Sequence, residues 1–582
     1  MSAMLKDSDL ISVQEVRSKV EEAYAAWQKY RAFSQEQVDE IVEQVAAAAR
    51  ANARRLAELA VEETGYGNAN DKLAKNLLCC DVLPRAMRGL KTIGILREVP
   101  DKKVVEIGVP MGVVAAILPT TNPTSTAIYK TLISLKAGNA IVISPHPRAK
   151  ACSCETAAIL QRAAIDAGAP EGLVQCIYNS TIDATNALMK HARTGVILST
   201  GGSGIVRAAY SSGKPAFGVG PGNVPVLVDK SADIEEAVGK VVQGKSFDFG
   251  TVCSSEQTIV AEQGLRDRIL AALKARKAYL CDARQADALS KLLLTSHFGV
   301  NPDCVGQPPT KIAQMAGFEI PADTSILVVE IHGVGKQHPL SAEKLSPVLS
   351  LYFVADFAAA VDACEAILKF GGLGHTSVIH ANDDARVREY GLRMPSFRVL
   401  VNTPSPQGST GITTNVFPAM TLGCGAVAGN ITSDNVGPLN LINIKRIAYA
   451  VRKAEDAFEH PEAVSASSAP DRRTVVAAVE RYLEKRGVPQ APPIISAVVD
   501  RFLAAKRGGS PASTEPVVGS APSAPSPAIT IADFVCEEDV RKAIAQSKKI
   551  YIGPKTIVTP SARDLALRSD TLVQTEQRNA GR

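Results

Sequence analysis

The chain has 582 residues, 46% of them hydrophobic and 21% charged, which is typical of a globular protein too long for one core. A net charge of +5 without a long basic block argues against nucleic acid as the main partner, and eleven cysteines over this length do not make a disulfide framework. The polar start and the lack of an apolar run of ~20 residues predict neither a secretory signal nor a membrane span, so we expect a cytoplasmic protein with reduced thiols.

Helical and strand-like patterns alternate along most of the chain. Residues 11–60 carry apolar side chains at three- and four-residue spacing, which predicts amphipathic helices. The next elements expected are strands at 104–107, 112–118, 140–144, 173–178 and 195–200, with helices at 151–167 and 182–191. This alternation predicts a parallel βαβ sheet and so an α/β fold, and a second α/β stretch follows from about 225 to 420.

Two cysteine pairs lie in helix-like sequence. Cys79-Cys80 and Cys152-x-Cys154 have no partner pair at zinc-finger spacing. We interpret them as buried apolar thiols and expect no metal site.

The character of the sequence changes after about residue 460. Residues 461–507 contain two amphipathic helical patterns, with apolar stripes such as Val475/Val479/Leu483 and Val498/Phe502 that either pack back on the core or bind a partner. Residues 508–528, rich in Gly, Ser, Pro and Ala, predict a flexible linker. In the small module or tail at 529–582 we predict one helix from Phe534 to Ala545, a strand near 548–552 and a turn at 556–564.

The segment around Cys253 is the strongest chemical signal. It reads Phe247-Asp-Phe-Gly-Thr-Val-Cys253-Ser-Ser-Glu-Gln257, a glycine-containing turn before a β-branched run. A thiol on a loop fixed by a strand is suited to nucleophilic attack, and it forms thioesters. Cys253 is therefore a candidate for covalent catalysis through an acyl-enzyme.

Two glycine clusters follow or precede predicted strands. Thr200-Gly201-Gly202 stands between a strand and a helix start, where backbone N–H groups favour a phosphate, although a tight turn explains the pattern equally well. Gly220, in Gly218–Asn223, permits close backbone approach or positive φ.

Three polar residues are weaker candidates when each is taken alone. Asn122, in Thr121-Asn-Pro-Thr124, can donate to an oxyanion or simply turn the chain. Glu343 can bind a ribose or be a surface carboxylate, and His375 can be an acid/base group, a ligand contact or a turn residue.

In chain order, the distinctive segments are Glu63-Thr-Gly65, Thr121-Asn-Pro-Thr124, Lys136–Ala140, Ser144-Pro-His-Pro147, Gly201-Gly202, Gly220-Pro-Gly-Asn223, Gly250–Glu256, Glu343–Pro347, Gly374-His-Thr376, Ser433-Asp-Asn435 and Leu441–Arg446. Over residues 15–455 this series resembles the aldehyde dehydrogenase superfamily. The closer resemblance is to its CoA-acylating branch, the propionaldehyde and acetaldehyde dehydrogenases of bacterial microcompartments.

The resemblance implies a role for each candidate residue. Cys253 would attack the aldehyde, Asn122 would stabilise the oxyanion, NAD⁺ would take the hydride and CoA would take the acyl group. His375 would be an active-site or CoA-side residue. The cofactor-binding residues would be Ser144, Pro145, Thr200, Gly201, Gly202, Gly220 and Glu343.

Four residues bear on the type of reaction and its substrates. Val219 stands where hydrolytic relatives carry a general-base Glu, which favours transfer to a thiol over hydrolysis. Phe249 stands where many relatives have Asn, which leaves the aldehyde preference open. Pro147 and Arg148 replace a ribose-binding Glu, so use of NADP⁺ stays open beside NAD⁺.

The resemblance also implies an architecture. We expect a Rossmann-like cofactor domain at 1–226, a catalytic domain at 227–429, and an oligomerisation arm from 95–110 and 430–460 that makes a dimer or tetramer. The tail would attach the enzyme to the shell or cargo of a bacterial microcompartment. A hydrolytic aldehyde dehydrogenase and an inactive scaffold are the alternatives.

Overall fold

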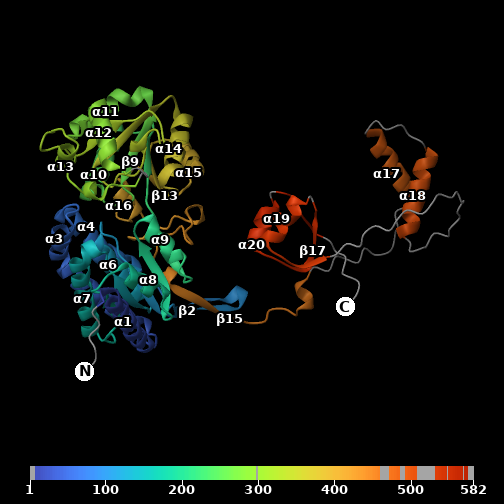
Figure 1. The fold of residues 1–582 in the computed structure, drawn as a ribbon, viewed down its shortest axis with the longest axis horizontal. Helices are drawn as coiled ribbons and strands as arrows, with labels where there is room; N and C mark the ends of the chain where they lie inside the picture. The colour runs from blue at the N-terminus through green and yellow to red at the C-terminus, as the bar shows by residue number, and fades with distance from the viewer. Residues whose placement is uncertain are drawn as a thin grey trace. The chain divides into compact units, whose positions relative to one another are not determined.

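A computed structural model describes residues 7–295, 299–458, 471–485, 492–506, 531–546, 548–567, 569 and 571–574. The chain divides into two compact units, Met1–Ala457 and Phe458–Arg582. The first unit holds both large sheets and all of the candidate residues (Figure 1). No helix in the described ranges is long and apolar enough to cross a bilayer.

The chain opens with four helices, and the first three confirm the helices predicted from the spacing of apolar residues at 11–60. They are α1 (Ser8–Tyr30), α2 (Gln35–Ala51), α3 (Ala53–Thr64) and α4 (Ala69–Leu77). Asp7 caps α1, and Ser34 and Gln37 form a capping box at α2. Val16, Val20 and other residues of the predicted stripe are fully buried, so the helices are held by core packing.

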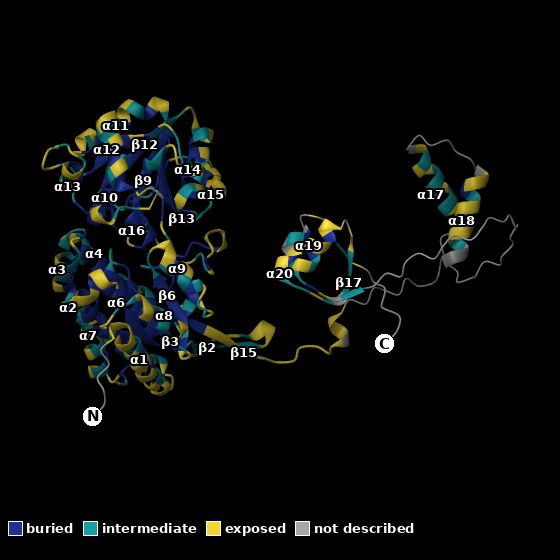
Figure 2. Cartoon of the chain, viewed as in Figure 1, coloured by how far each residue is buried: buried dark blue, intermediate teal, exposed yellow. Residues whose placement is uncertain are grey.

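A five-stranded parallel sheet follows, in the order β5-β4-β3-β6-β7. Its strands are β3 (Val113–Ile117), β4 (Ala140–Ser144), β5 (Val174–Cys176), β6 (Thr194–Thr200) and β7 (Ala216–Val219). The helices between them are α6 (Pro123–Lys136), α7 (Lys150–Asp166), α8 (Ile182–Lys190) and α9 (Ser203–Tyr210). The predicted βαβ alternation is confirmed, and Figure 2 shows the buried interior of this layer.

The second sheet has seven parallel strands in the order β10-β11-β12-β9-β8-β13-β14. These are β8 (Val224–Val228), β9 (Glu256–Glu262), β10 (Tyr279–Leu280), β11 (Leu327–Glu330), β12 (Val348–Val354), β13 (Gly374–His380) and β14 (Ser396–Val401). The helices in this region are α10 (Ile234–Ser246), α11 (Arg266–Ala275), α12 (Ala283–Leu293), α13 (Pro309–Met315), α14 (Phe357–Gly371), α15 (Asp384–Arg393) and α16 (Ser405–Ser409). The change of sheet falls between Val219 and Val224, a few residues before the proposed boundary at 226/227.

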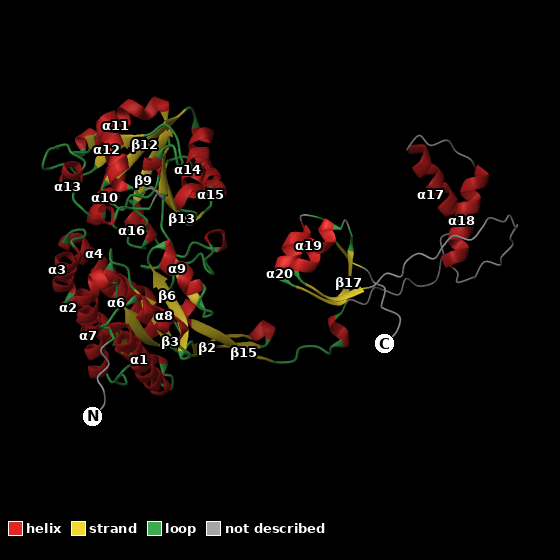
Figure 3. Cartoon of the chain, in the orientation of Figure 1, coloured by secondary structure: helices red, strands yellow, loops and turns green. Residues whose placement is uncertain are grey.

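A three-stranded antiparallel sheet joins two distant parts of the chain (Figure 3). It consists of β1 (Gly94–Val99), β2 (Val104–Pro110) and β15 (Ile442–Ala448). Glu106 on the middle strand pairs with Arg97 at 2.6 Å and Arg446 at 3.1 Å. Ile444 and Ile447 of β15 are exposed on this sheet, which coincides with the proposed oligomerisation arm.

The second unit contains a helical pair and a small α/β module. The pair is α17 (Arg472–Lys485) and α18 (Pro492–Lys506), which pack on each other with Arg472 bound to Asp500 at 2.5 Å. The module is a parallel sheet of β16 (Ile531–Val535), β17 (Ile550–Val558) and β18 (Leu572–Gln574), with α19 (Glu537–Ala545) and α20 (Pro560–Leu567) between the strands. The predicted linker at 508–528 lies outside the described residues.

Two predictions within the module are wrong in detail. Phe534, expected to begin a helix, lies in β16, and the helix begins at Glu537. Residues 556–564, expected to be a turn, form the end of β17 and the start of α20. The strand β16 exists because it pairs with β17, which lies more than ten residues further along the chain, and a local pattern does not reveal such a pairing.

Candidate active site

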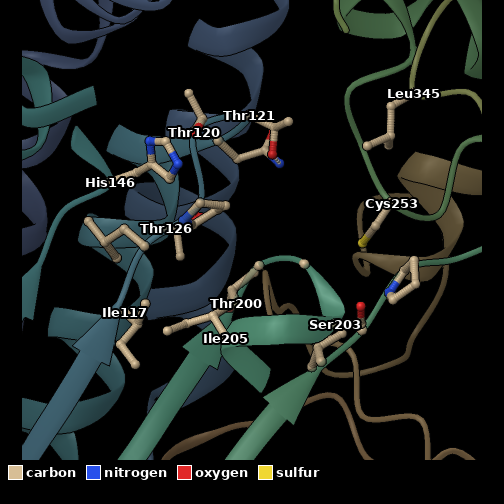
Figure 4. A pocket seen from close by; sticks show the side chains of 18 of the residues that line it. Ile117, Thr120, Thr121, Thr126, His146, Thr200, Ser203, Ile205, Cys253 and Leu345 are labelled. Carbon is tan, nitrogen blue, oxygen red and sulfur yellow. Dashed lines mark hydrogen bonds between the residues drawn. The ribbon is translucent and has the colours of Figure 1, made fainter. Parts of the chain in front are cut away.

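A cavity of about 1080 Å³ contains nearly all of the predicted site residues. The carboxyl ends of β3, β4, β6 and β7 line it from one side, which is where open parallel sheets bind ligands. Cys253 and Leu345 line it from the other side (Figure 4). The lining includes Asn122, Ser144, Pro145, Thr200, Gly201, Gly202, Gly220, Cys253 and Glu343.

Cys253 lies on the cavity wall just before β9, and His375 lies behind it near the start of β13. His375 Nε2 is 3.3 Å from Cys253 Sγ, and His375 Nδ1 is 3.0 Å from Thr376 Oγ1. Burial, with the nearby Glu343, raises the pKa of Cys253 to about 12, while burial and Arg398 lower the pKa of His375 to about 3. At neutral pH the pair is therefore a thiol beside an uncharged imidazole.

Gly222 brings a backbone turn against the nucleophile. A Cβ at this position would lie 2.2 Å from the Cys253 carbonyl oxygen and 3.2 Å from the His375 ring, so only glycine fits. Its N–H donates to Glu343 Oε1 at 3.3 Å. Burial raises the pKa of Glu343 to about 8, although this N–H acts in the opposite direction.

Asn122 occupies the N-cap position of α6, yet its side chain does not cap the helix. Its Oδ1 accepts from Lys75 Nζ at 2.5 Å, and its Nδ2 donates to Thr121 Oγ1 at 3.0 Å. The side chain of Asn122 therefore does not have the simplest structural role, that of a helix cap.

Phe249 stands four residues before Cys253 in an unusual backbone conformation. Asp248, Phe249 and Gly250 all have positive φ, at 48°, 51° and 73°. Asn and Asp tolerate the left-handed region better than other non-glycine residues, so a phenylalanine at this position is unusual for its backbone conformation. Phe249 itself does not line the cavity.

Several charged residues near the site were not predicted from the sequence. Arg398 donates to Thr376 Oγ1 at 3.4 Å and to the Gly423 carbonyl at 2.5 Å. Lys72 and Lys75 of α4 are buried beside Asp248. The described residues hold no cluster of three or more His, Cys, Asp or Glu side chains placed to bind a metal ion.

Known proteins similar to this chain are aldehyde dehydrogenases. Residues 3–287 match the model of the aldehyde dehydrogenase family. The bifunctional aldehyde-alcohol dehydrogenase AdhE of Escherichia coli K12 is 44% identical over 455 residues, which are 77% of this chain and 50% of that protein. The chain thus spans about half the length of the curated relatives that it matches in this group.

Two solved structures align over nearly their whole length. An acetylating aldehyde dehydrogenase from Geobacillus thermoglucosidasius is 48% identical, with a TM-score of 0.76 over 77% of this chain and 99% of that one. A propionaldehyde dehydrogenase from the Clostridium phytofermentans fucose utilisation bacterial microcompartment is 28% identical, with a TM-score of 0.68 over 75% and 97%. The chain therefore belongs to the aldehyde dehydrogenase family, and within it to the acylating aldehyde dehydrogenases.

Proposed function

We propose that the chain oxidises a short-chain aldehyde to an acyl-CoA through a thioester on Cys253, with NAD⁺ as hydride acceptor and CoA as acyl acceptor. The contact between Cys253 Sγ and His375 Nε2, on the wall of a large cavity, carries this proposal. It places a nucleophile on the cavity wall, where a substrate can reach it, and a buried proton acceptor against that nucleophile.

Cys253 begins the reaction as a neutral thiol. As Sγ bonds to the aldehyde carbon, its proton passes to His375 Nε2, and the carbonyl oxygen becomes an oxyanion. His375 accepts at Nε2 when its Nδ1–H donates to Thr376. Since burial disfavours an imidazolium, His375 holds this proton only briefly and releases it to solvent, as the one net proton that the oxidation produces beside the reduced coenzyme.

The oxyanion needs donors, and Asn122 is the proposed side-chain donor. One Nδ2–H is directed to Thr121, and the second is available to the substrate oxygen, together with the backbone N–H of Cys253. Because these donors are fixed before the reaction, they stabilise negative charge without reorganisation.

The cavity fits a dinucleotide in size and in the groups along its wall. Thr200, Gly201 and Gly202 lead into the first turn of α9, where backbone N–H groups favour a diphosphate. A Cβ on Gly202 or Gly204 would meet no atom within 4 Å, so this wall is open to a ligand. Ser144, Pro145, Gly220 and Glu343 line the rest of the proposed cofactor site. When bound, the nicotinamide supplies the hydride acceptor that turns the thiohemiacetal into a thioester.

CoA completes the reaction by thiolysis. Its sulfur bonds to the acyl carbon, the bond from that carbon to Cys253 breaks, and the CoA proton returns to Cys253 through His375. The product is an acyl-CoA, and the thiol of Cys253 is regenerated.

Slow hydrolysis of the thioester is part of the proposal. Val219 lines the cavity. The resemblance implies that it stands where hydrolytic relatives carry a general-base Glu, and a valine cannot accept a proton. Glu343 is the single carboxylate among the described lining residues, and the Gly222 N–H already occupies one of its oxygens. Water therefore lacks a free carboxylate base on the cavity wall, whereas a thiol is nucleophilic enough to react without one.

The products formed with and without CoA test this function. With CoA, we expect acyl-CoA and reduced coenzyme in equal amounts over many turnovers. Without CoA, we expect about one equivalent of reduced coenzyme per site and then free acid at least ~10²-fold more slowly, since the general base is missing. Free acid released at a comparable rate without CoA would favour the hydrolytic alternative. Parallel assays with NAD⁺ and NADP⁺ on C2–C4 aldehydes define the preferred substrates.

We also propose that the second unit directs the enzyme to a bacterial microcompartment, as a homo-oligomer assembled through the arm of β1, β2 and β15. The microcompartment origin of one structural neighbour supports this context. On α18, Ile494, Val498 and Phe502 repeat every four residues and are each more than half exposed. Ile495 and Val499 on the same helix are buried, so the exposed stripe is a second apolar face that fits a shell or cargo protein.

Deleting residues 461–582 is expected to leave turnover unchanged and to abolish co-sedimentation with shell material. Turnover persists because every proposed catalytic residue lies in the first unit. Val498→Asp/Phe502→Asp tests the stripe directly, and Arg473→Asp on the neighbouring helix controls for added charge. If the enzyme that lacks residues 461–582 still co-sedimented with shell material as the full chain does, the targeting role would be refuted.

A further inference from the structure

Helix α4 carries two buried lysines that contact the loop of the proposed oxyanion donor. Lys72 and Lys75 are three residues apart and so share one face of the helix. Lys75 Nζ donates to Asn122 Oδ1 at 2.5 Å, and Lys72 Nζ donates to the Thr121 carbonyl at 3.0 Å. An ammonium group has no acceptor, so the amide oxygen of Asn122 must face Lys75 and the Nδ2 group must face away.

The same ammonium groups contact the loop that carries the nucleophile. Lys75 and Lys72 both pair with Asp248 Oδ2, the latter at 3.1 Å, and Thr251 Oγ1 donates to the same oxygen at 2.5 Å. The Asp248 side chain is fully buried. Burial alone would raise the pKa of this carboxyl, but the two lysines lower it overall, so Asp248 is held as a carboxylate.

Asp248 also anchors a strained turn. With Asp248 and Phe249 both at positive φ, the backbone pays on the order of 1–3 kcal/mol at each residue. A second anchor is the N–H of Asn68, which donates to Asp248 Oδ1 at 2.9 Å. Gly250 follows with a positive φ, and a Cβ there would lie 2.6 Å from the Ser346 carbonyl oxygen. The turn that leads to Cys253 therefore has one tightly defined conformation.

We propose that Lys75 is a positioning residue for Asn122: it orients the amide so that Nδ2 faces the substrate oxygen, and through Asp248 it fixes that amide relative to the Cys253 loop. This inference rests on the proposed oxyanion role of Asn122. Asn122 precedes α6 and Cys253 precedes β9, so the two oxyanion donors belong to different sheets. Lys75 contacts both loops and sets the distance between the donors. Its positive charge also polarises the Asn122 amide and makes its N–H a stronger donor.

A double-mutant cycle in the full chain separates positioning from a general loss of stability. Lys75→Met keeps the length of the side chain but removes the donor. It is expected to lower kcat by about 10²-fold with little change in the KM for the aldehyde, the coenzyme or CoA. In an Asn122→Ala background the same substitution should lower kcat by less than about 3-fold, because the amide it orients is already absent. Lys72→Met is the matched control, since Lys72 contacts Asp248 and Thr121 but not the Asn122 amide. Its effect on kcat is expected to stay within about 10-fold.

A second variant covers the case in which Lys75→Met does not fold because Asp248 loses a partner. Lys75→Met/Asp248→Asn removes one charge of each sign, and the same loss of kcat and the same non-additivity with Asn122→Ala are expected. Two results would overturn the role of Lys75 and leave the proposed function intact. One is that the losses of kcat from the Lys75 and Asn122 substitutions add in the combined variant. The other is that the Lys75 variant keeps its kcat within about 3-fold of wild type while Asn122→Ala is nearly inactive. Normal turnover of Asn122→Ala would instead remove the oxyanion role, and the role of Lys75 with it.

Discussion

A Cys253→Ala variant is expected to lose aldehyde-dependent coenzyme reduction by on the order of 10⁴-fold or more, because removing a covalent nucleophile costs that much in comparable enzymes. In the proposed mechanism the sulfur forms the bond to substrate, and His375 at 3.3 Å has no proton to accept once the thiol is gone. Stopped-flow measurement of coenzyme reduction checks this result, since a single turnover is enough to reveal residual chemistry.

Cys281→Ala is the matched control for this loss. Cys281 is a half-buried thiol between β10 and α12 that does not line the cavity, so its removal should leave the rate within about 2-fold. Coenzyme binding and thermal unfolding of Cys253→Ala should remain close to wild type. Substantial turnover by Cys253→Ala would show that the acyl group is carried elsewhere.

An Asn122→Ala variant is expected to lower kcat by about 10²–10³-fold, the usual effect of removing one oxyanion donor. The Asn122 side chain makes no capping bond to α6, so the loss should appear in turnover rather than in the stability of that helix. Pre-steady-state coenzyme reduction separates the first chemical step, where the oxyanion forms, from the later transfer to CoA.

Asn122→Asp sharpens this test. It keeps the size and the contact with Lys75 but presents a carboxylate to the developing negative charge. We expect it to be at least as slow as Asn122→Ala. If both variants kept kcat within about 3-fold and instead lowered the melting temperature, Asn122 would have a structural role only.

The sequence predicts the layers of the first unit well because their signals are local. Every residue of β3 and β4 is buried, and such doubly apolar runs separated by helical patterns are typical of parallel sheets. The small module is harder to predict, because its strands are short and one face of its sheet stays exposed at Phe534 and Ile557. A half-exposed apolar run of this length is compatible with either a helix or a strand.

In the candidate site, too, the residues that lie in a sequence motif are predicted, and those that meet only through the fold are missed. Cys253, Asn122 and Glu343 are predicted because each lies in a recognisable motif, and the fold brings them to one cavity. Lys75 and Asp248 are missed because 173 positions separate them and charged residues are normally exposed. The local hints are faint: Lys72 and Lys75 recur at helical spacing, and Asp248 precedes a Phe-Gly turn. Only the folded contact reveals that these charges are paired around Asn122.

Mass spectrometry of the intact protein, mixed with a short-chain aldehyde and oxidised coenzyme in the absence of CoA, tests the central claim most directly. The account predicts a mass increase equal to one acyl group, mapped by peptide analysis to Cys253 and removed by added CoA as acyl-CoA appears. The Cys253→Ala protein should show no such increase. An unmodified Cys253 in wild-type protein that has reduced its coenzyme would contradict a thioester mechanism.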